Sequence, residues 1–240
     1  MKTVLLTSAA ALALLVGGTA QAAPAMNALG AHGVAQPAVH HVPPKGSKVL
    51  YDQNSGTGSD GFFSQTLSSY PQYDEYLADD FTVPKGATWK VSEVDVGGFY
   101  YVEAGPASSV NVYFWSNNKG LPDGKKALVS CLNVTPTGGL STGAFEIKLP
   151  KKCAKKASFA GGKKGTTYWL SVQANMASED TSGYWAWDVV SVHGNQAAGD
   201  WYGGSVQTLE PSCNTSFQTM DYCTGTTTDL SFELMGKSKK

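Results

Sequence analysis

The sequence predicts an all-β protein, a single jelly-roll-like antiparallel β-sandwich with disulfides. From Lys48 onward, short runs of alternating apolar and polar residues are separated by clusters of Gly, Pro, Asn and Asp, at the spacing typical of sandwiches. No segment keeps the helical spacing of apolar residues over three turns. The chain also has four cysteines, an even set of the kind that forms disulfides in an oxidising compartment.

The first 22 residues have the pattern of a secretory signal peptide. Lys2 leads into an apolar run over residues 4–16, and Ala20-Gln21-Ala22 forms an A-x-A cleavage site. The apolar run is too short to span a bilayer. We therefore expect the protein to be secreted, to an extracellular or periplasmic location, without a membrane span.

Residues 23–46 contain four prolines and no aromatic residue. Such a segment cannot bury enough apolar surface to order itself, so it is expected to be a flexible linker or propeptide. The β-sandwich domain is expected over residues 47–236. A basic tail, 237–240, follows it.

Within the domain, alternation assigns each strand a core face and an outer face. In the run 109–116, for example, Val112 and Phe114 are expected to point into the core. Residues 192–228, rich in Gly and Thr, are expected to form a long loop. The expected strands are residues 48–52, 77–83, 88–102, 109–116, 127–135, 143–149, 166–175, 184–191 and 229–235.

Large aromatic residues fall on the polar side of two strands. Alternation places Tyr113 and Trp115 opposite the core-facing residues of their strand, and it places Trp169 on the same side as Gln173. A large aromatic side chain on a solvated sheet is either covered by the 192–228 segment or kept for a ligand such as a sugar ring. Trp169, Tyr113 and Trp115 are therefore the candidate ligand-binding residues, and both alternatives stay open.

The four cysteines allow three pairings, and short closed loops favour the sequential one. This pairing joins Cys131 to Cys153 and Cys213 to Cys223. No C-x-x-C occurs and no histidine lies near a cysteine in the sequence, which argues against a zinc site.

The charge pattern limits the classes of partner. The formal net charge is −1 and all 18 basic residues are lysine. Without the planar guanidinium fork of arginine, specific nucleic-acid recognition is not expected. Seven lysines lie between positions 148 and 164. They predict either attraction to an anionic polysaccharide or membrane surface, or a sheet edge protected from aggregation.

Catalytic patterns are sparse. His193 is the only histidine of the folded part, so a serine hydrolase would have to use it with Asp188 or Asp200, yet no G-x-S-x-G occurs. Glu93 and Asp95 share a strand face about 7 Å apart. That spacing fits an inverting acid and base, and it fits two solvated carboxylates equally.

Calcium is the one cofactor that the sequence leaves open. Asp79 and Asp80 are the candidate ligands, because sandwich loops often gather oxygen ligands, and a turn cap is the alternative. Residues 52–60 begin like a calcium loop, but Thr57 and Phe63 stand where such a loop needs Gly and Glu.

The order of several short motifs resembles a family of secreted bacterial jelly-roll-like β-sandwich domains of uncharacterised function, often surface-anchored. The motifs are the run Ala78-Asp79-Asp80-Phe81-Thr82-Val83-Pro84, then Trp89, Gly120-Leu121-Pro122, Tyr168-Trp169-Leu170-Ser171-Val172 and the closing Asp229-Leu230-Ser231-Phe232-Glu233-Leu234-Met235-Gly236. The resemblance covers most of 48–236 and implies the fold but no catalytic residues. Anchored members carry an apolar C-terminal segment. This chain ends in 236–240 without one, so release is expected.

Two functions of different classes follow. The first is a non-catalytic secreted module, expected to be a monomer, that binds a polysaccharide or a cell-surface glycan. The second is a secreted hydrolase that uses carboxylates, with calcium as an option. The scarcity of histidine and the lack of a nucleophile motif favour the first.

Overall fold

The computed structural model describes residues 31–32, 42–54, 60–69, 74–101, 105–176, 184–191, 199–202, 213 and 216–240. The expected signal peptide and most of the expected linker lie outside these residues. Among the residues described, no helix is long and apolar enough to cross a membrane.

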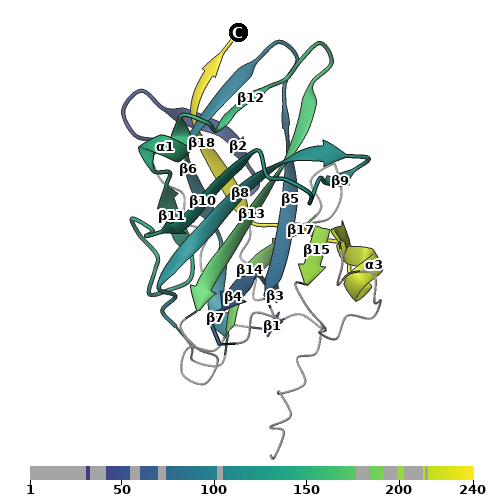
Figure 1. The fold of residues 1–240 in the computed structure, drawn as a ribbon. Helices are drawn as coiled ribbons and strands as arrows, with labels where there is room; N and C mark the ends of the chain where they lie inside the picture. The colour runs from purple at the N-terminus through teal and green to yellow at the C-terminus, as the bar shows by residue number, and fades with distance from the viewer. Residues whose placement is uncertain are drawn as a thin grey trace, which may run out of the picture.

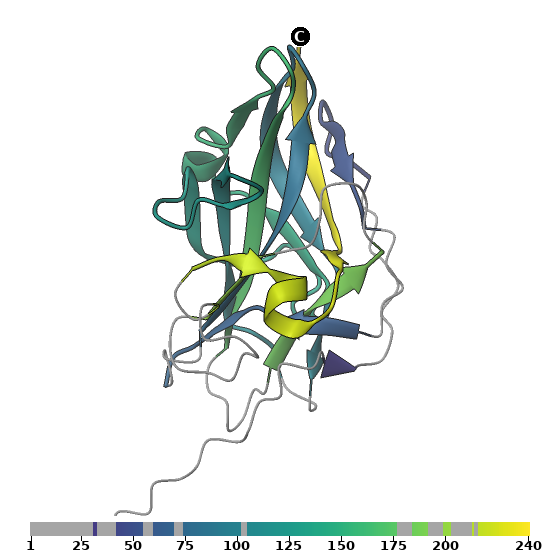
Figure 2. The same ribbon diagram turned by 90° about the vertical axis from the view of Figure 1, so that its right-hand side faces the viewer.

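The fold is an all-β sandwich, as the sequence predicts, and its two main sheets face each other across the core (Figures 1 and 2). The larger sheet has the order β10-β8-β13-β5-β15-β16, with β4 and β9 at its margins. Its strands are β4 (Gln65–Leu67), β5 (Glu75–Val83), β8 (Ser109–Asn118), β9 (Leu121–Pro122), β10 (Val129–Val134), β13 (Thr166–Met176), β15 (Gly199–Tyr202) and β16 (Gln218–Thr219).

The opposite sheet has the order β11-β6-β18-β2, with β12 on β6. It consists of β2 (Lys48–Asp52), β6 (Thr88–Val96), β11 (Phe145–Lys148), β12 (Ser158–Ala160) and β18 (Phe232–Lys239). A third sheet contains β1 (Ala31–His32), β3 (Asp60–Phe63), β7 (Gly98–Tyr101), β14 (Tyr184–Val190) and β17 (Asp229–Leu230). The short helices are α1 (Lys151–Ala154) and α3 (Met220–Thr224).

Alternation assigns the core faces correctly. Val112 and Phe114 of β8 are fully buried between the two main sheets, as are Leu170 and Val172 of β13. Aromatic rings join the sheets, and the centroids of Phe114 and Phe159 lie 4.9 Å apart. These contacts fix the outer face of the larger sheet as the side that carries the odd-numbered residues of β8 and β13.

The expected strand 88–102 is two strands, because the chain changes sheets at Gly97. β6 pairs with β11 and β18, whereas β7 pairs with β14. A Cβ atom on Gly97 would lie 2.7 Å from Ser231 Oγ and 3.0 Å from Asp188 Oδ2. Only glycine allows this close approach without displacing a neighbour.

Regular secondary structure occurs in two segments that were expected to have none, the loop 192–228 and the linker 23–46. The 192–228 segment contains β15, β16 and α3 instead of loop alone, and β15 pairs with β5 at the edge of the larger sheet. In the expected linker, Ala31 and His32 pair with β3. The short length of these elements hides them from a search for periodicity, since two to five residues show no reliable alternation.

The disulfides follow the sequential pairing. Cys131 on β10 is joined to Cys153 on α1, which fixes the helix against the edge of the larger sheet. Cys213 is joined to Cys223 on α3, which closes the segment that contains β16. No cysteine is free.

Candidate functional site

The outer face of the larger sheet carries the predicted ligand-binding aromatic residues. Trp169 on β13 lies opposite Trp115 on β8. Their side chains are 1% and 5% exposed, and Phe217 packs against Trp115 with ring centroids 5.6 Å apart. Of the two alternatives, the structure therefore shows the covered one. Phe217 of the 192–228 segment belongs to the same buried cluster as both tryptophans, and a ligand-binding role for Trp169 and Trp115 stays a prediction.

The indole N–H groups of Trp115 and Trp169 both donate hydrogen bonds to side chains. Trp115 Nε1 donates to Ser171 Oγ at 2.9 Å, and Trp169 Nε1 donates to Asn117 Oδ1 at 3.0 Å. A buried indole normally needs such a partner. These two tryptophans form a second small core on the outer face, and alternation alone cannot distinguish it from a solvated face.

Tyr113 has a different environment. It is partly buried, its ring stacks against Trp115 at 5.6 Å, and its other neighbour is Tyr76 of β5, with centroids 5.9 Å apart. The tyrosine hydroxyls of residues 76 and 113 are hydrogen-bonded to each other. Burial raises the pKa of both phenols above its ordinary value. Both tyrosines line an open pocket.

Three carboxamides form the other wall of this pocket. Asn111 of β8 donates to Asn175 Oδ1 of β13 at 2.8 Å, and Asn175 Nδ2 donates to Asn111 Oδ1 at 3.1 Å and to Asn133 Oδ1 at 3.2 Å. Thr66 Oγ1 of β4 donates to Asn175 Oδ1 at 3.0 Å. Side chains from four strands therefore hold the amides in one arrangement.

The position of Asn133 depends on an irregularity in β10. The pairing of β10 with β8 shifts between Cys131 and Val134, and Asn133 has a φ of 55°. Asparagine tolerates this left-handed conformation better than most residues. Its backbone N–H donates to Asn111 Oδ1 at 2.9 Å. The bulge turns Asn133 toward the amides and leaves Leu132 57% exposed at the rim.

We call this hollow the amide–tyrosine pocket. Its volume is about 490 Å³, and it is lined by Thr66, Ser68, Tyr76, Ser108, Asn111, Tyr113, Leu132, Asn133, Asn175 and Met176. None of these described residues carries a charge at neutral pH. Hydroxyl and amide groups that both donate and accept hydrogen bonds lie beside aromatic rings, an arrangement suited to an uncharged ligand with many hydroxyls.

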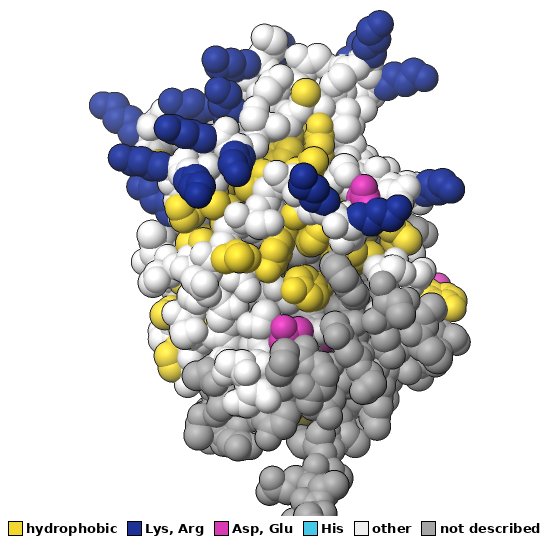
Figure 3. All heavy atoms as spheres, viewed as in Figure 1, with side chains coloured by type: hydrophobic (Ala, Val, Ile, Leu, Met, Phe, Trp, Pro, Cys, Tyr) yellow, Lys and Arg dark blue, Asp and Glu magenta, His cyan; other side chains and the backbone are white. Residues whose placement is uncertain are grey.

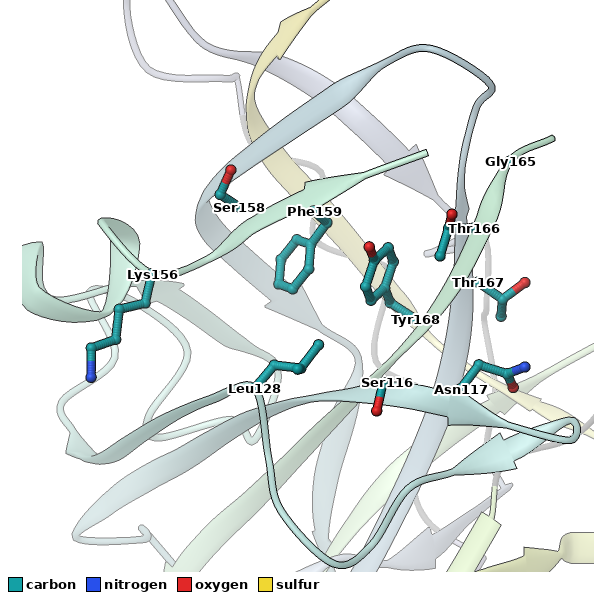
Figure 4. Close-up of a pocket in the computed structure, with 10 residues that line it drawn as sticks. All are labelled: Ser116, Asn117, Leu128, Lys156, Ser158, Phe159, Gly165, Thr166, Thr167 and Tyr168. Atoms are coloured by element: carbon teal, nitrogen blue, oxygen red, sulfur yellow. The ribbon is translucent and has the colours of Figure 1, made fainter. Parts of the chain in front are cut away.

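A second hollow lies at the other end of β13, between this sheet and β12 (Figure 4). It has a volume of about 780 Å³. Phe159 and Tyr168 lie next to each other with ring centroids 5.0 Å apart, and Leu128 is 49% exposed. Lys156 is also among the lining residues (Figure 4). We call it the β12 hollow.

The candidate calcium ligands lie within β5. Asp79 is completely buried, and its Oδ2 accepts hydrogen bonds of 2.6 Å from Gln53 Nε2 and from the N–H of Leu230. Its Oδ1 accepts one of 2.7 Å from the N–H of Asp80. Burial first, and then the nearby Asp229, raise the pKa of Asp79 well above its ordinary value. These donors occupy the oxygens that a calcium ion would need.

Glu93 and Asp95 do share a face of β6, and both are buried. Asp95 is paired in register with Glu146 on one side and Glu233 on the other. Burial, and then the negative charges of the neighbouring carboxylates, raise the pKa of Asp95 to about 8. Two solvated carboxylates, the simpler alternative, are therefore ruled out.

No group of three or more His, Cys, Asp or Glu side chains within the described ranges could hold a metal ion. The calcium site thus stays a prediction. His193, residues 55–59 and the side chain of Asp200 lie outside the described residues, while Asp188 is buried in β14 and burial raises its pKa to about 7.

Sequence reasoning missed the three carboxamides and Tyr76. Alternation placed Asn111 and Asn175 on the outer face, but their residue type gave no reason to select them. The signal that could have found them is cross-strand pairing, since Asn175 lies opposite Ser109 and Gln173 lies opposite Asn111. Strand pairing becomes visible only in the sheet.

Comparisons with known proteins identify no family. No family model matches the chain, and no curated protein matches it. A solved structure of the cysteine protease and lectin-like domains of Cwp84, a surface layer associated protein of Clostridium difficile, is similar over 82% of this chain and 37% of that chain, at 12% identity and a TM-score of 0.44. A structure of the clostridial cysteine protease Cwp84 after propeptide cleavage is similar over 82% of this chain and 41% of that chain, at 14% identity and a TM-score of 0.44. The chain therefore spans about two fifths of these proteins, and the family resemblance stays a prediction.

Proposed function

We propose that the protein is a secreted, non-catalytic module that binds a polysaccharide or cell-surface glycan through the amide–tyrosine pocket. The observation that carries the proposal is the preorganised set of Asn111, Asn133 and Asn175 beside Tyr113 and Tyr76. Carboxamides can donate to one sugar hydroxyl and accept from the next, and a tyrosine face packs against the C–H side of a ring.

The hydrogen-bonded network reduces the entropic cost of binding. Asn175 accepts from Thr66 and Asn111 and donates to Asn133, so its side chain is already ordered before a ligand arrives. The left-handed backbone of Asn133 supports the same view, since strained residues and bulges occur often at binding sites. The uncharged lining fits a neutral sugar better than it fits acid–base catalysis.

A glycan array and polysaccharide pull-down with the exported protein test the proposal. Asn133→Gly is the informative variant, because glycine keeps the backbone at φ 55° and removes only the carboxamide. We expect it to weaken retention on the glycan that the native protein selects by about tenfold, with an unchanged melting temperature.

Lys119→Gly is the matched control. Lys119 also has a φ of 55° and is exposed, but it lies in the turn between β8 and β9. Equal loss of binding in both variants, or no binding of the native protein to any glycan in the array, would contradict the proposal. Hydrolysis of a bound polysaccharide would favour the carboxylate-dependent alternative.

A further inference from the structure

Many described lysines gather at one end of the face that Figure 3 shows. This end carries α1 and β12. Every described lysine is exposed. Within the described ranges, none of them forms an ion pair with a carboxylate.

The formal net charge of −1 conceals this separation. Many carboxylates are buried, among them Asp79, Asp95 and Asp188, with exposures of 0%, 1% and 1%. Burial favours the protonated form of a carboxyl group, and a carboxyl group that keeps its proton adds no negative charge to the field outside the protein. The lysine-bearing end is thus strongly positive although the sequence is nearly neutral.

The β12 hollow opens within this positive end. Lys156 lines it directly, Lys155 precedes it on the chain, and Lys163 and Lys164 precede Gly165, another lining residue. The hollow combines these cations with the hydroxyl side chains of Ser116, Ser158, Thr166 and Thr167. Its apolar wall consists of Phe159, Tyr168 and Leu128, which lie close to one another in Figure 4.

We propose that the β12 hollow and its flanking lysines bind an anionic polysaccharide, with a sugar unit in the hollow and its acidic groups on the lysines. This proposal goes beyond the amide–tyrosine pocket and does not depend on it. Hydroxyl groups and an apolar ring face suit a sugar, and ammonium groups suit the carboxylates or sulfates that recur along such a chain.

The chemistry of this end favours an anionic polysaccharide over two other polyanions, a nucleic acid and an anionic membrane. Specific nucleic-acid recognition favours the bidentate fork of arginine, and this chain has no arginine. Lysines attract an anionic membrane surface, and apolar side chains that project into the headgroup region strengthen the association. Here the exposed apolar residues Leu128 and Val49 each line a hollow instead. A DNA duplex and anionic vesicles therefore serve as competing probes.

Binding of the full exported chain to polygalacturonate and dextran sulfate, with neutral dextran as reference, tests the proposal. The native protein should bind both acidic polymers, and the affinity should fall as salt rises from about 0.05 to 0.5 M. The combined variant K155A, K156A, K163A and K164A should weaken binding by about tenfold or more.

A charge-matched control separates the hollow from unspecific attraction. The variant K45A, K48A, K85A and K240A removes four lysines from the same end, and three of them line a different hollow beside β2. It should retain most of the affinity. Equal loss in the two variants would overturn the proposal, because binding would then follow only the number of charges.

The role of the hollow itself is tested without changing charge. Leu128→Trp should fill the β12 hollow and weaken binding at least fivefold, whereas Leu132→Trp, at the amide–tyrosine pocket, should not. Full binding by the Leu128→Trp variant would overturn the proposal, as would equal or tighter binding to a DNA duplex or to phosphatidylglycerol vesicles. Asn133→Gly should leave this binding unchanged, so the two sites can fail separately.

Discussion

The backbone N–H of Leu230 donates a hydrogen bond of 2.6 Å to the buried carboxyl group of Asp79, which lies 151 positions earlier in the chain. The contact joins β17 of the third sheet to β5 of the larger sheet. Gln53 Nε2 donates to the same oxygen and also to the carbonyl of Leu230. One side chain thus satisfies donors from two distant segments where the sheets meet.

Asp79→Ala should destabilise the protein by about 3 kcal/mol. The change leaves the buried N–H groups of Leu230 and Asp80 without their side-chain acceptor and removes one of the two acceptors of Gln53 Nε2. An unsatisfied buried donor costs roughly 1–3 kcal/mol. Denaturant unfolding measures the loss. Asp221→Ala, at an exposed position of α3, is the control and should change stability by less than about 0.5 kcal/mol.

Calcium removal separates the predicted metal site from this hydrogen-bonded role. If N–H donors satisfy the Asp79 oxygens, excess EDTA should leave the melting temperature of the exported protein unchanged. Added calcium should not raise it. A calcium-dependent increase in melting temperature that Asp79→Asn abolishes would instead establish a metal site at Asp79 and Asp80.

Stability should decrease as the pH rises from about 5 to 8. The pKa values of Asp95 and Asp188 are raised to about 8 and about 7, so the folded state keeps protons that the unfolded state releases above its ordinary pKa near 4. The stability that these groups contribute is complete at low pH and is lost as the pH passes through the raised values. Each group can contribute at most about 1.4 kcal/mol per pH unit.

Chemical denaturation at pH 5 and pH 8 measures this difference. Asp95→Asn keeps the shape of the protonated carboxyl group, so the variant should show a smaller difference between the two pH values. Asp221→Asn changes an exposed carboxylate and should leave the difference intact. Greater stability of the native protein at pH 8 than at pH 5 would show that these carboxyl groups are ionised in the fold.

Trp169→Ala should cost about 3–5 kcal/mol of stability, as expected for removal of a buried tryptophan. The ring is 1% exposed, and its N–H group bonds to Asn117. Tyr222→Ala, at a side chain that is 47% exposed, is the comparison and should have a small effect. Loss of glycan binding by Trp169→Ala with an unchanged melting temperature would establish Trp169 as a ligand platform.

The paired change Cys213→Ser and Cys223→Ser should expose Trp115. The disulfide closes the segment that carries Phe217, and Phe217 covers Trp115. We expect a red shift of tryptophan fluorescence and faster acrylamide quenching, with a loss of about 2–3 kcal/mol in stability. The paired change Cys131→Ser and Cys153→Ser lies away from this cover and should leave the emission unshifted.

The sequence alone determined the fold class, most strands and the face of each residue in β8 and β13. It favoured, among three possible pairings, the disulfide pairing that the structure has. These properties depend on local periodicity and short separations, which a single sequence records directly. Val112 and Phe114 point into the core for that reason, and Trp115 and Trp169 point away from it.

The tertiary structure decided what lies against each face. Phe217 is 48 positions from Trp169, and no local pattern shows that its segment covers the tryptophans. The same holds for Asn111, Asn133 and Asn175, which strand register and a bulge in β10 bring together. It also holds for Asp95, whose pairing with Glu146 and Glu233 depends on two other strands. Contacts between distant segments arise from packing and hydrogen-bond satisfaction across the whole chain, so they are absent from the pattern of any one strand.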